Sequence, residues 1–142
     1  MTNLFDYLKW RGGLTFSQDP VNSVDALIFS TLTYLNYRGS LETDFYTPVL
    51  LYDAAADFFS QPIDEKRLRD KNDLRLLREA AATARFGHTA ICMYRTQFVP
   101  EQETQFAAMA FLLDDGSAFL GFRGTDYSLV GWKEDFNMSF QQ

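Results

Sequence analysis

The chain has 142 residues, a formal net charge of -6 at pH 7 and a hydrophobic content of 46%. This length fits one domain of roughly 100–200 residues, and the hydrophobic content excludes a disordered or low-complexity chain. Because acids outnumber bases and no long basic run occurs, we expect neither a nucleic acid nor an anionic membrane surface as a partner. The sequence therefore predicts a single domain over residues 1–142.

The cysteine content and the hydrophobic runs indicate the cellular compartment in which the protein is expected. Cys92, the single cysteine, lies in the apolar segment AICMY, so we expect its thiol to be buried and inert. A chain without an internal disulfide suits a reducing compartment. The first residues lack the pattern of a signal peptide, and no apolar run reaches the ~18 residues that a membrane span needs. We therefore expect a soluble cytoplasmic protein without a membrane span.

Helical spacing of apolar residues dominates the first two thirds of the chain, where helices are predicted over 2–10, 22–39, 48–59 and 73–86. The second of these segments has the clearest start signal, because Asn22 can cap the helix and Asp25 stands at the third helical position. The residues of this segment that keep helical spacing are Val24, Leu27, Ile28, Thr31 and Leu35.

The ends of these helices are also predicted from single residues. Gly39 is expected to end the second helix, and Gly87 the last one. Asn72 is expected to cap the last helix at its start, with apolar residues facing inward. The helices should therefore end before the strands that follow.

The spacing changes after residue 88, and three strands are predicted over 89–99, 104–113 and 117–122. Asp114–Ser117 reads as a tight turn between the last two strands, so we expect a meander. These two strands are apolar on both faces, which predicts that both faces are covered and that Phe111 and Phe122 are buried. The preceding helices are the available cover.

The end of the last strand carries the chemically suggestive residues. Gly124 permits backbone conformations closed to other residues, and Thr125 and Asp126 place amides near a predicted helix N-terminus. Such amides stabilise a developing negative charge, as in an oxyanion hole. The structural alternative is a strand that leaves the sheet through a capped turn, with Asp126 or Ser128 as the cap and Arg123 paired to a carboxylate.

The segment FLGFRGTDYSLVGWKEDF resembles class three lipases of the α/β-hydrolases, in which a strand reading roughly "vaFRGT" precedes a "W..D" helix. Residues 3–35 resemble the N-terminus of an uncharacterised bacterial subgroup of lipase-like proteins. The resemblance implies an α/β fold: the amino-terminal part of an α/β-hydrolase-like fold, with helices followed by a three-stranded meander and a helix. It implies an oxyanion-hole role for Thr125, structural or orienting roles for Asp126 and Asp135, and an ester or acyl substrate for the full-length protein.

The residue inventory does not complete such an enzyme. No Gly-x-Ser-x-Gly motif occurs, and His88, the single histidine, stands at the wrong place in the Ser, Asp, His order of the triad. One histidine and one cysteine cannot supply the usual ligands of a zinc site, and we expect no metal and no cofactor. The chain is therefore expected to be a truncated amino-terminal fragment or a shortened relative of a serine hydrolase, and inactive alone.

Two other classes of function remain open. In one, the chain is a non-catalytic interaction module, and the exposed edge of its sheet pairs with a second copy or another protein. A homo-oligomer, most commonly a symmetric dimer, is then expected. In the other, the chain binds a small anionic molecule at Thr125.

Overall fold

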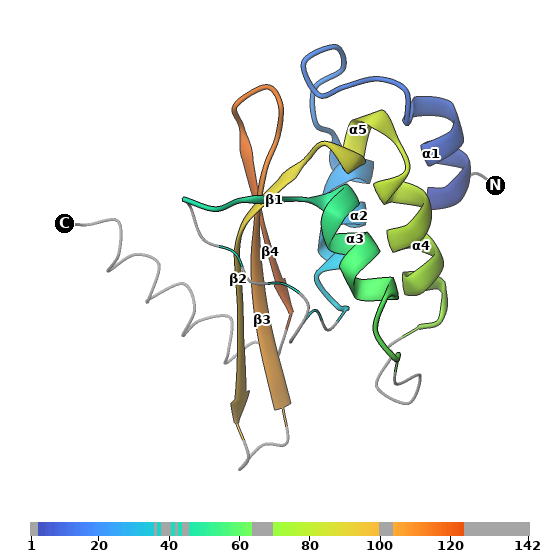
Figure 1. Ribbon diagram of the computed structural model, residues 1–142. Coiled ribbons are helices and arrows are strands. Elements are labelled where there is room, and N and C mark those ends of the chain that lie inside the picture. Colours follow the sequence, from blue (N-terminus) through green and yellow to red (C-terminus); the bar gives the residue numbers. More distant parts are fainter. Residues whose placement is uncertain are drawn as a thin grey trace.

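The computed structural model describes residues 3–35, 37, 41, 43, 46–63, 70–99 and 104–123. Within this part of the chain, the helices form one layer and pack on one face of an antiparallel sheet (Figure 1). The predicted helix after residue 123 lies outside the described residues. No helix of the described part is both long and apolar enough to cross a membrane.

The helical layer contains five helices in the described part of the chain: α1 (Leu4–Arg11), α2 (Ser23–Leu32), α3 (Leu51–Phe59), α4 (Asn72–Ala81) and α5 (Ala84–Gly87). Capping boxes start the first two, as the sequence predicts for α2. In α2, the Asn22 side chain accepts the Asp25 backbone N–H at 3.1 Å, and the Asp25 carboxylate accepts the Asn22 backbone N–H at 3.0 Å. This reciprocal pair satisfies two N–H groups that a helix start otherwise leaves unpaired.

Two of the predicted helices are wrong in extent. α2 ends at Leu32 and not at Gly39, because the chain leaves the helix after Thr33. The predicted helix 73–86 is two helices, since Thr83 adopts an extended backbone (φ −88°, ψ 153°) and its side chain accepts the Phe86 N–H. Thr83 thereby caps α5 and lies between it and α4, which ends at Ala81.

Asn72 does not cap α4 as predicted. It is the first residue of that helix, and the cap position is taken by Lys71, which makes no side-chain capping bond. The start is held instead by Asp70, whose side chain accepts the Asn72 backbone N–H at 2.9 Å. Asp70, two positions earlier, therefore makes the side-chain hydrogen bond at the helix start that was predicted for Asn72.

The sheet has four strands among the described residues: β1 (Val49–Leu50), β2 (Ala90–Val99), β3 (Thr104–Leu112) and β4 (Ala118–Arg123). Their order is β1-β2-β3-β4, and every neighbouring pair is antiparallel. The predicted meander is therefore confirmed. β1 falls within a predicted helix, because a strand of two residues has no recognisable period. The mixed helix and antiparallel sheet does not confirm an α/β-hydrolase fold.

The core between the two layers is built around Phe29 of α2. Its ring lies 4.7 Å from that of Phe111 and 5.3 Å from that of Phe119, measured between centroids, so it bridges the helices to β3 and β4. Gly121 of β4 lets α2 approach closely, because a Cβ there would lie 2.2 Å from Oγ1 of Thr33. Phe29 is fully buried and makes the main aromatic bridge between the layers.

The burial predictions for the two strand phenylalanines have different outcomes. Phe111 is fully buried on the helix-facing side of β3, as predicted. Phe122 is only partly buried and packs with a second cluster of Cys92, Met93, Ala108 and Ala110. Cys92 is buried as expected, and burial raises the pKa of its thiol.

The predicted turn between β3 and β4 also ties the sheet to the helical layer. Gly116 has φ +88°, a conformation that favours glycine. The Asp114 carboxylate accepts the backbone N–H groups of Phe16 at 2.9 Å and Ser17 at 3.3 Å. Burial acts to raise the pKa of Asp114, but the hydrogen bonds from Ser17 and Phe16 outweigh it, and the pKa lies below its usual value.

Replacing Phe111 with alanine should reduce the free energy of unfolding by about 3–5 kcal/mol, because a buried ring leaves a cavity. Leu112 is the matched control, since it is the next residue of β3 and is 43% exposed. Leu112→Ala should cost less than about 1 kcal/mol. Urea denaturation measures both, and equal losses would contradict the assignment of faces in β3.

The stabilising effect of Asp114 should depend on pH. A carboxylate whose folded pKa is depressed stabilises the fold above its unfolded pKa of about 3.9, and this stability is lost as pH falls through the folded pKa. Asp114→Asn should therefore reduce the free energy of unfolding at pH 7 and have a smaller effect near pH 3. Denaturant unfolding at the two pH values measures this, and an effect independent of pH would show that the charge does not matter.

Candidate interaction surfaces

The structure describes some of the residues that the sequence indicated as functional and not others. Thr125 and Asp126 lie outside the described residues, and their predicted roles stay predictions. Arg123 ends β4, and its guanidinium donates to the Tyr34 carbonyl just beyond α2. A cation is favourable near a helix C-terminus. His88 follows α5 and is exposed at the surface.

A buried ion pair joins α5 to α2. The side chains of Arg85 and Asp25 are both fully buried. Nη2 of Arg85 donates to Oδ2 of Asp25 at 2.6 Å, and Nε donates to Oδ1 at 2.9 Å, so the contact is bidentate. Bidentate arginine–carboxylate pairs are among the stronger hydrogen-bonded contacts in proteins. This pair links positions 60 residues apart in the chain.

The remaining Arg85 donors hold the connection between α1 and α2. Nη1 donates to the carbonyls of Leu14 at 3.1 Å and Asp19 at 2.8 Å, and the guanidinium lies 4.1 Å from the ring centre of Phe16. Burial acts to lower the pKa of Arg85, but the hydrogen bonds to Asp25 and its charge outweigh it and raise the pKa. The guanidinium therefore stays charged and fixes this connection.

Tyr7 extends the network from the ion pair towards the surface. Its hydroxyl donates to Oδ1 of Asp25 at 2.8 Å and accepts from Nδ2 of Asn22 at 2.9 Å. Burial is the main cause that raises the pKa of Tyr7. Because α1 carries Tyr7 and α2 carries Asp25, these bonds set the position of the two helices relative to each other.

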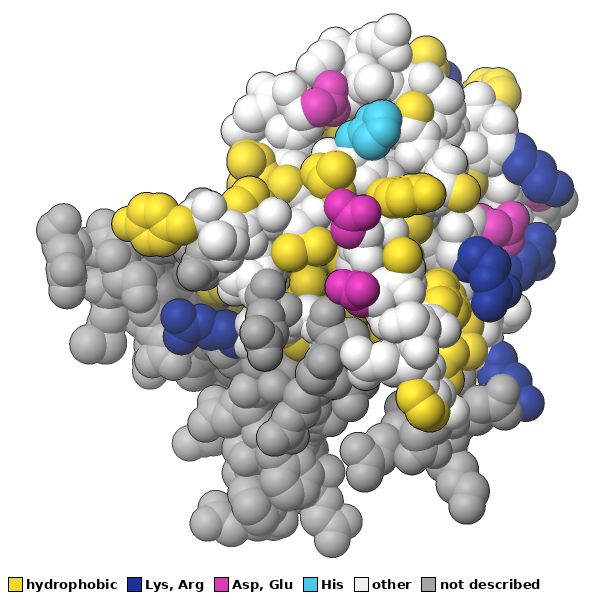
Figure 2. All heavy atoms as spheres, viewed as in Figure 1, with side chains coloured by type: hydrophobic (Ala, Val, Ile, Leu, Met, Phe, Trp, Pro, Cys, Tyr) yellow, Lys and Arg dark blue, Asp and Glu magenta, His cyan; other side chains and the backbone are white. Residues whose placement is uncertain are grey.

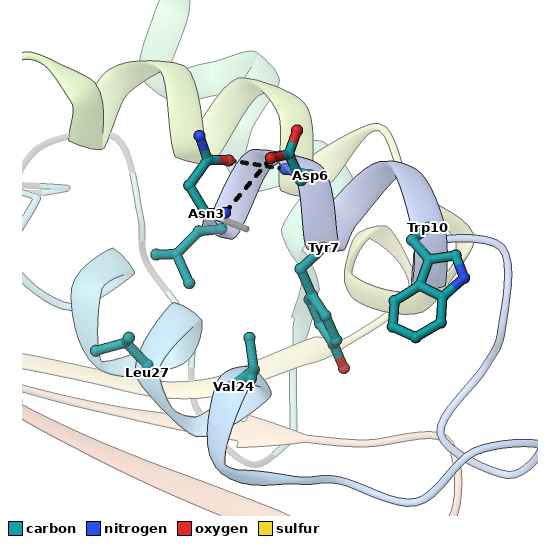
Figure 3. A pocket seen from close by; sticks show the side chains of 7 residues that line it. Asn3, Asp6, Tyr7, Trp10, Val24 and Leu27 are labelled. Carbon is teal, nitrogen blue, oxygen red and sulfur yellow. Dashed lines mark hydrogen bonds between the residues drawn. The ribbon is translucent and has the colours of Figure 1, made fainter. Parts of the chain in front are cut away.

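An open apolar groove lies between α1 and α2, and Tyr7 of this network is one of its lining residues. Figure 3 shows side chains from both helices that line it. Its volume is ≈ 710 Å³, within the range of roughly 300–1,000 Å³ for ligand pockets. Two of its hydrophobic residues are strongly exposed, Trp10 at 74% and Leu27 at 54%. The lining residues are Asn3, Leu4, Asp6, Tyr7, Trp10, Val24 and Leu27.

The sheet offers a second exposed surface at β4. Within the described part of the chain, β4 pairs with β3 on one side, and no strand pairs with its other side. Leu120, in the middle of β4, is 42% exposed, and Ala118 at its start is also exposed. An apolar edge of this kind offers backbone N–H and C=O groups to another strand.

The charged residues do not form a metal-binding cluster in the part of the chain that the structure describes. On the face shown in Figure 2, basic side chains gather mainly at the edge near α4, and acidic side chains lie closer to the centre. The α4 bases include Arg75, which pairs with Glu79 at 2.5 Å. Both signs of charge thus occur on this face.

Comparison with known proteins corrects the family prediction. A family model described as Mbeg1-like matches residues 80–142, which is less than half of the chain. The match is not to a lipase or to another α/β-hydrolase family, so the predicted resemblance to class three lipases is wrong, and the serine-hydrolase function stays a prediction. That resemblance depended mainly on a short strand–turn–helix motif, and such motifs also recur for structural reasons. No curated protein and no solved structure matches the chain.

Sequence reasoning missed the residues that build these surfaces. Asp25 was recognised only as a helix-start residue, and Arg85 was not recognised at all. Leu27 was read as part of the regular apolar side of α2, yet it faces the groove and is exposed. The one local signal of a buried ion pair was an arginine at an otherwise apolar helix end. This signal does not indicate which acidic residue pairs with the arginine.

Removing one partner of the ion pair should be costly, because it leaves the other charge buried. Asp25→Ala should reduce the free energy of unfolding by about 3–5 kcal/mol. Arg85→Lys should also destabilise the fold despite its charge, since an ammonium cannot form the bidentate contact. The control is Asp53→Ala, which removes an exposed acid from the first turn of α3. A urea midpoint that falls equally for Asp25→Ala and Asp53→Ala would contradict the account.

Proposed function

We propose that this chain is a non-catalytic interaction module that pairs with a second copy of itself through the side of β4 on which the described residues place no strand. The observation that supports the proposal is the position of β4 at the end of the sheet order, with an exposed leucine at its centre. Protein chains commonly cover, charge or pair such an edge, because its backbone groups otherwise bind other chains. Pairing with an identical strand is the simplest way to satisfy it.

The length of β4 suits a symmetric pair. β4 spans Ala118–Arg123, so a two-fold axis through its middle would pass near Leu120 and Gly121. In an antiparallel pair about that axis, each copy places Leu120 close to the Leu120 of the other, and the two sheets become one continuous sheet. β1 cannot serve equally well, because it has only two residues.

The proposal assigns the module to the cytoplasm. Cys92 is buried, and no disulfide partner exists for it in the sequence. A thiol of this kind is compatible with a reducing compartment. Dimerisation then depends on strand pairing and apolar contact alone, so it should be reversible on dilution.

Light scattering after size exclusion should show a dimer that dissociates on dilution towards the monomer mass of 16.4 kDa. Leu120→Lys should raise the dissociation constant at least about tenfold, because it places two like charges opposite each other at the centre of the pair. A clean monomer at high concentration would overturn the proposal.

Leu112→Lys is the matched control for edge pairing. Leu112 is 43% exposed, almost the same as Leu120, but it belongs to β3, which has a strand on each side. The edge model predicts that this variant still dimerises. If Leu112→Lys weakens the dimer as much as Leu120→Lys does, the copies associate face to face rather than by strand pairing.

A further inference from the structure

We infer that the α1–α2 groove is a docking site for a cationic amphipathic helix of another protein. This partner is separate from the second copy proposed at β4, and the groove residues belong to α1, α2 and the residue that caps α1. The inference rests on the shape and support of the groove, on the satisfied backbone of its walls, and on the sign of its charge.

The groove is held in shape by polar contacts that lead from its lining into the interior. Tyr7 forms part of its lining, and the Tyr7 hydroxyl is fixed by Asp25 and Asn22 of the network described above. Asp25 is fixed in turn by Arg85. Because the lining is positioned before any partner arrives, binding requires little ordering of the groove itself.

The walls of the groove favour a helix over an extended peptide. Both walls are α-helices, whose backbone groups bond within the helix, so they offer no row of free N–H and C=O groups to a strand. A helical partner satisfies its own backbone and brings only side chains. α1 has eight residues, which at about 1.5 Å per residue gives room for roughly two turns of a partner helix. Its anchors should therefore follow i, i+3 or i+4, and i+7 spacing.

The exposed hydrophobic residues supply the contacts for such anchors. Trp10 stands at one end of the groove and Leu27 on the opposite wall, as Figure 3 shows. Leu4 and Val24, both partly buried, complete the apolar lining. Tryptophan is enriched among residues that dominate binding energy at interfaces.

The charge at the groove selects the sign of the partner. Asp6 is the charged residue among the lining residues. Its carboxylate accepts the Asn3 backbone N–H at 3.5 Å, which leaves most of its acceptor capacity free. The nearby Arg11 is engaged, since it lies 3.5 Å from the Asp19 carboxylate and 4.4 Å from the ring centre of Trp10. A lysine or arginine beside the apolar face of the partner is therefore favoured, and the net charge of -6 steers it.

The test uses two model peptides of about 14 residues that differ only in charge. Both carry leucine with i, i+3, i+4, i+7 spacing, and the flanking polar positions are lysine in one and glutamate in the other. Trp10 and Trp132 are the two tryptophans of the chain, so a Trp132→Phe variant reports on Trp10 alone by fluorescence. The lysine peptide should shift this signal and bind at least about tenfold more tightly than the glutamate peptide at low salt.

Three variants locate the site and the origin of the preference. Leu27→Lys should weaken the lysine peptide at least about tenfold, because it removes an anchor and adds a like charge. Asp6→Asn should reduce the lysine-over-glutamate preference several-fold, since it removes the acidic charge of the lining. Asp53→Asn is the matched control, because it removes the equivalent first-turn acid of α3 outside the groove, and it should leave the preference unchanged.

Each contrary outcome overturns a defined part of the inference. Equal binding of the two peptides would exclude a cationic partner, and an unchanged Trp10 signal with both would exclude a helix-docking groove. Loss of self-association in Leu27→Lys would mean that a second copy fills the groove. The dimer test at Leu120 does not depend on these results. If the peptides do not bind the groove, the proposal of a β4 dimer is therefore still decided by that test.

Discussion

A charged guanidinium in the interior is the constraint on which the helical layer depends. Arg85 has no exposed side-chain surface, and each of its three nitrogens donates a hydrogen bond. Leaving such a charge unpaired would cost several kcal/mol, so its partners must be in place in the folded state. The acceptors come from α2 and from the connection between α1 and α2. A residue of α5, just before β2, thus fixes α2 and the connection that leads to it.

The same network connects the interior to a surface where binding can occur. Asp25 accepts from Arg85 in the core and from the Tyr7 hydroxyl in α1. Tyr7 also belongs to the lining of the groove, so the separation of α1 and α2 is set by the hydrogen bonds of Tyr7 and not by apolar packing alone. This accounts for an open groove with an exposed Trp10 in a layer whose other side is tightly packed. The sheet contacts the helices at a different place, where Phe29 of α2 packs on Phe111 of β3. β4 is the last strand in the order of the sheet.

Local signals predicted the parts of the fold that are locally determined. The capping box of Asn22 and Asp25, the turn at Asp114 and the three long strands depend on neighbours a few residues away, and all are confirmed. The break at Thr83 was missed because the apolar spacing continues through it, and only the side-chain bond to Phe86 reveals the cap.

The interaction surfaces could not be predicted in the same way. Asp25 and Arg85 are 60 residues apart, and nothing in a single sequence pairs them. Helical spacing places Leu27 on a side of α2 but does not say whether another element covers that side. The lipase resemblance failed for a related reason, since a short motif at a strand end reports local geometry and not the family of the chain.

Hydrogen exchange measured by mass spectrometry on the Arg85→Lys variant tests the central claim most directly. If the guanidinium organises the helical layer, amide protection should fall in α1, in residues 14–20 and at the start of α2. Protection in β3 and β4 should remain close to that of the unmodified chain, because Phe29 and the strand pairing hold them independently. Uniform loss of protection in both layers, or no loss in α1, would contradict the account.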